Sequence, residues 1–109
     1  MEERRFSRRY PVLLKARVII AGTQQSYEGK VTDISFSGVR FLCNETIDKD
    51  QQLELTISIE EQEITLKTVV VWAAKLDGLE GMQHGMQVVG VAFVGDCKKL
   101  EAFFKKIQG

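Results

Sequence analysis

The sequence predicts a mainly all-β domain, a six-stranded antiparallel β-barrel with one C-terminal amphipathic α-helix. Six short segments are rich in Val, Ile and Leu, and in several of them apolar and polar residues alternate as in strands. Turn signals separate the successive segments. Short, mostly sequential strands in so small a chain favour a barrel that closes and so leaves no exposed edge. At the C-terminus the apolar period changes from that of a strand to that of a helix.

Length and composition indicate one compact domain. The chain has 109 residues, of which 44% are hydrophobic and one is proline. No apolar run approaches the roughly 20 residues that span a bilayer, so membrane insertion is not expected. The charged N-terminus is not followed by the apolar segment of a signal peptide. Cys43 and Cys97 form no C-x-x-C or metal-ligand pattern, and they are interpreted as reduced thiols of a cytoplasmic protein, with Cys43 packed in a strand; a disulfide is the less favoured alternative.

Residues 1–11 are predicted to form a flexible basic arm, and residues 12–109 the barrel domain. Pro11 marks the entry to the fold. In the fifth strand the alternation places Trp72 on the same face as Val70, so Trp72 is expected in the core or at the mouth of the barrel. The six predicted strands are Val12–Ala21, Tyr27–Ile34, Val39–Cys43, Leu53–Ile59, Ile64–Ala73 and Met86–Val94.

A helix is predicted over about residues 96–107, with Asp96 as its N-cap. Lys105 and Lys106 suit the negative end of the helix dipole. The helix would cap the barrel or pack along its side. Its apolar stripe follows the spacing i, i+3, i+4 and i+7 and consists of Leu100, Phe103, Phe104 and Ile107.

The charges are balanced in number but not in position. Fifteen basic residues face 15 acidic ones, yet residues 1–17 have a net charge of +4, so the remainder has −4. A basic arm on an acidic body either docks on its own domain or binds an anion. A protein that binds a nucleic-acid polymer would more often be basic over a whole face, so the sequence favours a small anionic ligand. The arginines of the arm are Arg4, Arg5, Arg8 and Arg9.

A polar hairpin is predicted at Asp33–Gly38, between the second and third strands. Its carboxylate and hydroxyls can cap backbone donors or contact a ligand, and Gly38 permits a positive φ or a close backbone approach. Taken alone, neither segment requires a function: the hairpin can be an ordinary turn, and the basic arm can be a solvated tail. Together they favour a ligand site on loops. An enzyme is not expected, because the sequence lacks a nucleophile–base pair, metal-ligand spacing and a Gly-rich phosphate loop; the one histidine, His84, has no partner nearby in sequence.

Two motifs carry a family resemblance. The segment Arg4-Arg5-Phe6-Ser7-Arg8 matches Arg-x-x-x-Arg, and Asp33-Ile34-Ser35-Phe36-Ser37-Gly38 matches Asp/Asn-x-Ser-x-x-Gly. Val70-Val71-Trp72 and Gly90-Val91-Ala92-Phe93 look like the later strands of the same family. In this order, over almost the whole chain, the pattern resembles the PilZ domain family. The resemblance implies a bacterial receptor module that binds cyclic di-GMP without catalysis and without a cofactor.

Cyclic di-GMP carries two phosphodiester charges and two guanines. Arginine can pair with phosphate and stack on a base, and a carboxylate can accept the guanine N1 and N2 donors. The resemblance implies that ligand orders the arm and that a protein effector of motility, pilus or exopolysaccharide machinery responds. The implied ligand-binding residues are Arg4, Arg5, Arg8, Arg9, Asp33, Ser35 and Gly38.

Two questions of detail stay open at this point. Arg4 and Arg8 are the preferred pair, because Phe6 lies two positions before Arg8, but Arg5 and Arg9 satisfy the same spacing. Glu3 stands where some members of the family carry another arginine, which leaves open one bound ligand or a stacked pair.

Two other functions fit the sequence less well. A PilZ-like module could have lost nucleotide binding and act only on a protein partner, which the intact motifs oppose. A small barrel could bind RNA or single-stranded DNA, which the −4 charge of the body opposes.

Overall fold

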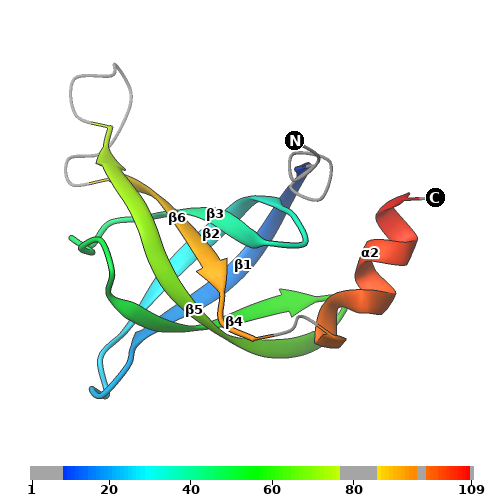
Figure 1. The fold of residues 1–109 in the computed structure, drawn as a ribbon, viewed down its shortest axis with the longest axis horizontal. Coiled ribbons are helices and arrows are strands. Elements are labelled where there is room, and N and C mark those ends of the chain that lie inside the picture. The colour runs from blue at the N-terminus through cyan, green and yellow to red at the C-terminus, as the bar shows by residue number, and fades with distance from the viewer. Residues whose placement is uncertain (1–8, 77–85, 96–97, 109) are drawn as a thin grey trace.

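The computed structural model describes residues 9–76, 86–95 and 98–108 and confirms the predicted barrel. Six antiparallel strands close in the order β1-β2-β3-β6-β5-β4, and Figure 1 shows them wrapped around one core. Closure pairs every strand on both sides, which removes the exposed edges. The strands are β1 (Tyr10–Ile20), β2 (Ser26–Ile34), β3 (Gly38–Cys43), β4 (Gln52–Ile59), β5 (Gln62–Lys75) and β6 (Gln87–Phe93).

The core fills the interior of the barrel with the apolar residues of the alternating strands. Val18, Phe41 and Leu55 are among the side chains with no exposed surface. Each buried side chain of this size stabilises the fold by about 1.5–3 kcal/mol. Cys43 packs in β3 as a free, buried thiol, as expected, and burial raises the pKa of this thiol.

The ends of some elements differ from the prediction. β1 begins at Tyr10, two residues early, and so includes Pro11. The register of β1 against β2 shifts just after Pro11, and irregular pairing of this kind accommodates a residue without an N–H. β5 extends over Gln62–Lys75, longer than the predicted strand at both ends. Pattern reading misses such ends, because pairing with a neighbouring strand extends a strand beyond its apolar residues.

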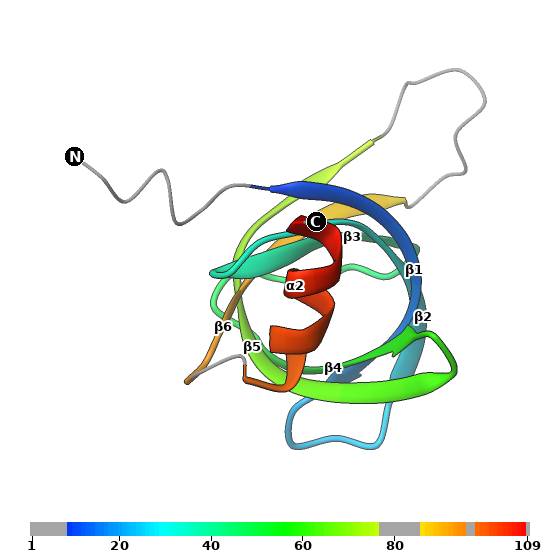
Figure 2. The same ribbon diagram turned by 90° about the vertical axis from the view of Figure 1, so that its right-hand side faces the viewer.

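The C-terminal helix is shorter than predicted. A 3₁₀ turn at Lys98–Leu100 leads into α2 (Glu101–Gln108), so the α-helical part begins five residues later than the predicted start. Asp96, the predicted N-cap, lies outside the described residues. Figure 2 shows α2 lying across one end of the barrel. Leu100 and Phe104 are buried there, which confirms that these two residues of the predicted apolar stripe pack against the barrel.

An ion pair also holds α2 to the barrel. Lys106 Nζ lies 2.5 Å from Glu60 Oε1, at the β4–β5 turn. Both side chains are mostly exposed, so the pair adds about 1 kcal/mol at most, and the apolar contacts dominate. Over the described residues, no helix is long and apolar enough to cross a membrane.

Candidate ligand-binding site

The hairpin between β2 and β3 is built around Ser35. Its side chain is fully buried. The backbone N–H groups of Ser37 and Gly38 both donate to Ser35 Oγ over 3.2 Å, and the Ser35 N–H donates to the Gly38 carbonyl over 2.8 Å. The hydroxyl therefore satisfies the turn from inside and fixes its shape.

Gly38 is required by a close approach of backbones. A Cβ at this position would lie 1.9 Å from the carbonyl oxygen of Val91 in β6. Gly38 does not have a positive φ. Of the two reasons that the sequence allowed for this glycine, the structure shows the close approach.

Asp33 reaches the outer surface because of a bulge in β2. Thr32 is an extra residue against β3, since Val31 pairs with Phe41 and Asp33 pairs with Arg40. Val31 and Ile34 are therefore both buried, while the carboxylate of Asp33 lies outside. A regular strand would have placed Asp33 on the same face as Val31.

Two arginines meet the Asp33 carboxylate. Arg9 Nη1 donates to Asp33 Oδ1 over 2.5 Å. On the neighbouring strand, Arg40 Nε lies 3.4 Å from Asp33 Oδ2. The second contact is an ion pair without hydrogen-bond geometry, and Arg40 Nε is buried without a hydrogen-bond partner in the described part of the chain. Among the described residues, Asp33 Oδ2 therefore has no donor as close as the one that Arg9 gives to Oδ1.

Trp72 lies outside the barrel, which corrects the prediction that it shares the face of Val70. Val70 pairs with Val91 and Trp72 pairs with Gly90, so Val71 is an extra residue in β5. Val70 is buried, whereas Trp72 is 37% exposed. Alternation alone could not reveal this change of face, because the extra residue interrupts the period of two.

Trp72 and Arg40 are neighbours across β6. Arg40 and Trp72 both pair with Gly90, from opposite sides. The Arg40 guanidinium carbon lies 5.6 Å from the centroid of the Trp72 ring, a cation–π distance. A Cβ on Gly90 would lie 2.5 Å from the indole, so the missing side chain makes room for the ring.

The result is one row of residues across four strands. We call this row, Asp33 on β2, Arg40 on β3, Gly90 on β6 and Trp72 on β5, the outer row. It presents a carboxylate, a guanidinium and an indole on a rigid surface, with Arg9 at one end. These groups suit an anionic ligand that carries a planar base. Arg40 was not predicted as a site residue, because its place beside Trp72 depends on how β3 and β5 pair with β6.

The structure brings together only part of the predicted site. Arg9 and Asp33 are in contact, and Ser35 and Gly38 support the hairpin behind them. Arg9 belongs to the register that pairs it with Arg5, and the preferred register stays a prediction. Arg4, Arg5 and Arg8 lie outside the described residues, as does His84.

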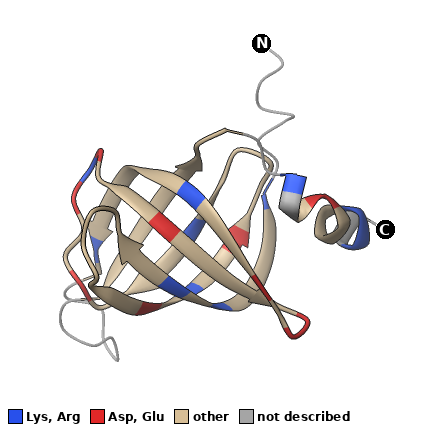
Figure 3. Cartoon of the chain, turned by 90° about the horizontal axis from the view of Figure 1, so that it is seen from below, with Lys and Arg blue, Asp and Glu red and all other residues tan. Residues whose placement is uncertain are grey.

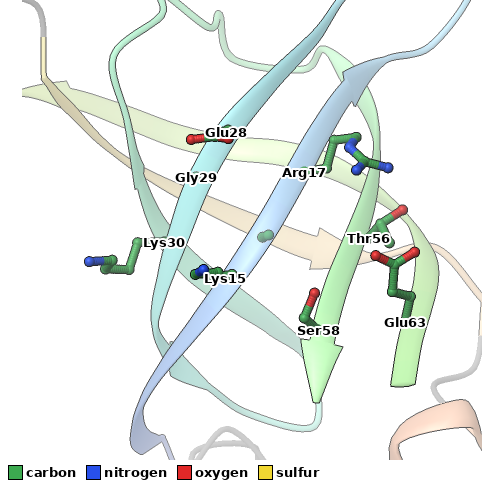
Figure 4. Close-up of a pocket in the computed structure, with 9 residues that line it drawn as sticks. Lys15, Arg17, Glu28, Gly29, Lys30, Thr56, Ser58 and Glu63 are labelled. Atoms are coloured by element: carbon green, nitrogen blue, oxygen red, sulfur yellow. The ribbon is translucent and has the colours of Figure 1, made fainter. Parts of the chain in front are cut away.

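A separate pocket lies on the outer face of β1, β2 and β4, with a volume of about 370 Å³ (Figure 4). Basic and acidic side chains both line it, among them Lys15, Lys30 and Glu63, so its charge is mixed. It shares no residue with the outer row. Among the described residues there is no group of three or more His, Cys, Asp or Glu that could hold a metal ion.

The fold is thus a closed barrel with polar and aromatic groups gathered on one part of its outer face. The chain belongs to the PilZ domain family: the model of the PilZ domain matches residues 2–105. This shows the family that the two motifs predicted. No curated protein matches the sequence.

Two solved structures share the fold. The PilZ domain of YcgR from Escherichia coli, solved with c-di-GMP, has a TM-score of 0.71 and 13% identity, over 95% of this chain and 88% of that chain. The PilZ domain of CeSA from a cellulose-synthesizing bacterium has a TM-score of 0.59 and 14% identity, over 87% of this chain and 88% of that chain. At these identities the likeness shows the fold.

Proposed function

We propose that this chain is a bacterial, cytoplasmic receptor module that binds cyclic di-GMP and passes the binding event to a protein partner without catalysis. The observation that carries the proposal is the Asp33 carboxylate, turned outward by a bulge and contacted by Arg9 from the arm. Membership of the PilZ family and the likeness to a domain solved with c-di-GMP support the choice of ligand.

The residues have distinct roles in this proposal. Asp33 accepts hydrogen bonds from the N1 and N2 donors of a guanine, and Oδ2, which lies 3.4 Å from Arg40 Nε, is one of the accepting oxygens. Arg4, Arg5, Arg8 and Arg9 bind phosphate and guanine as the arm orders over the hairpin. Ser35 and Gly38 keep the hairpin in shape, since the hydroxyl of Ser35 is occupied within the turn.

Calorimetric titration with cyclic di-GMP tests the proposal. Wild-type protein should bind, and Asp33→Asn should weaken binding, because the amide replaces one acceptor oxygen with a donor. Loss of a charged hydrogen-bonding partner costs about 2–5 kcal/mol when it is central to the site. Arg8→Ala should also weaken binding, and unchanged affinity would remove the arm from the site. Glu28→Gln is the matched control, because Glu28 is an exposed acid on the same strand.

A module that binds only a protein is the alternative. Two arginines already neutralise Asp33 without a ligand, which is the observation in its favour. Wild-type protein that produces no heat with cyclic di-GMP, yet still captures a partner in a pull-down, would favour this alternative. A nucleic-acid polymer is disfavoured, because Figure 3 shows basic and acidic residues interspersed over the strands.

A further inference from the structure

We infer that Arg40 is a ligand-binding residue, whose guanidinium stacks on one guanine of the bound nucleotide while Trp72 backs it from the other side. This inference rests on the proposed function and assigns a role to a residue outside both sequence motifs. It also makes Trp72 a built-in reporter of the ligand, because the chain contains no other tryptophan.

The first support is the way in which Arg40 is held. Its guanidinium lies over the Trp72 ring at 5.6 Å and beside the Asp33 carboxylate at 3.4 Å. The side chain nevertheless remains 38% exposed. A long, flexible side chain thus has a restricted position and still offers surface to a ligand, which lowers the entropy cost of binding.

The second support is the position of Arg40 relative to Asp33. The two residues are directly paired on neighbouring strands, so their side chains leave the barrel side by side. A guanine whose edge meets the Asp33 carboxylate would have its face over the adjacent side chain. Guanidinium planes stack on bases, and an arginine also adds a positive charge near the phosphates.

The third support is the construction that holds Trp72. The bulge at Val71 turns the indole outward, and the absence of a side chain at Gly90 leaves room for the ring against β6. Bulges often re-aim side chains beside functional sites. Exposing the apolar ring of a tryptophan to water is less favourable than exposing a polar side chain. The placement of Trp72 on the surface, beside a guanidinium, therefore fits a role in the site.

The test compares two substitutions of Arg40 by calorimetry with cyclic di-GMP. Arg40→Lys keeps the charge beside Asp33 but has no plane for stacking, and Arg40→Ala removes both. If Arg40 stacks on a base, both variants should weaken binding by about 5- to 150-fold, the range for loss of one base-stacking contact. Arg17→Ala is the matched control, because Arg17 is an exposed arginine on β1, away from the outer row.

Trp72 fluorescence supplies an independent readout. Wild-type emission should change on saturation with cyclic di-GMP, and in Arg40→Lys the change should require the correspondingly higher ligand concentration. Circular dichroism would verify that each variant keeps its strands. Arg40→Lys with wild-type affinity would limit Arg40 to the role of a positively charged partner of Asp33 and overturn the inference, as would tight binding that leaves Trp72 emission unchanged.

The two failures are distinguishable. If wild-type protein does not bind cyclic di-GMP, the proposed function fails first, and the inference about Arg40 fails with it. If wild-type protein binds and Asp33→Asn weakens binding, but both Arg40 variants bind normally, then only the stacking role is wrong.

Discussion

The ring of Phe36 lies 4.2 Å from the ring of Phe104, centroid to centroid, with 31° between their planes. Phe36 belongs to the hairpin that carries Asp33, and Phe104 is the buried anchor of α2. The helix over the end of the barrel therefore contacts the hairpin of the candidate site directly. If ligand binding moves the hairpin, the contact between Phe36 and Phe104 would transmit that movement to α2.

Phe104→Ala should lower the free energy of unfolding by about 3–5 kcal/mol, because it removes a buried aromatic ring and leaves a cavity. Urea denaturation followed by circular dichroism would measure the loss. Lys105→Ala is the control, since Lys105 is an exposed residue of the same helix and should change stability by less than about 0.5 kcal/mol. Equal stability of the two variants would show that α2 contributes little to the fold.

Ser35→Ala should destabilise the domain by about 1–3 kcal/mol, because two backbone N–H groups lose a buried acceptor. Thermal unfolding beside Ser26→Ala, an exposed serine at the start of β2, would measure the difference. A Ser35→Ala protein as stable as wild type, but with weaker ligand binding, would instead assign the hydroxyl to direct ligand contact.

Gly90→Ala should displace Trp72, because the new Cβ would lie 2.5 Å from the indole. We expect a shift in the tryptophan emission of the free protein and a loss of stability of about 1–3 kcal/mol. Fluorescence spectra and urea denaturation would record both effects. An unchanged spectrum would mean that the indole does not rest on β6 in solution.

Cys43 should react slowly with alkylating reagents at neutral pH, because burial both shields the thiol and raises its pKa. A Cys97→Ser variant would leave Cys43 as the one thiol, and its alkylation rate with and without urea can be followed by mass spectrometry. The raised pKa of Cys43 also determines the direction in which stability changes with pH. The unfolded thiol ionises first, so stability should fall as pH rises through about 8.5 toward the folded-state pKa. Rapid alkylation of the folded variant would contradict this burial.

Much of the fold was predictable, because strand alternation and turn residues report directly on which face is buried. The closed barrel, the six strands and the C-terminal helix were all predicted. The start of the α-helix was not, because the 3₁₀ turn at Lys98–Leu100 contains the first residue of the apolar stripe and so resembles helix in sequence. Periodicity does not distinguish the two kinds of helix over one turn.

The site was predictable only in part. The motif around Asp33 identified the hairpin, and the structure adds that Ser35 acts inside it. Arg40 and the outward Trp72 were beyond the pattern, since both depend on register between strands that are distant in sequence. A bulge of one residue moves the side chains that follow it to the opposite face of the strand, and the local sequence does not reveal the bulge.

The bulge at Val71 has a consequence for insertions and deletions. Trp72 pairs with Gly90 and Val70 with Val91, so Val71 is the one residue between Thr68 and Lys75 that lacks a partner on β6. Residues 69 to 71 are all valine, so deletion of any one of them gives the same sequence. The shortened chain should keep every β5–β6 pair and leave Trp72 outside. Relatives with one residue fewer at this point could therefore keep the same surface, and an alignment gap there would not signal a lost site.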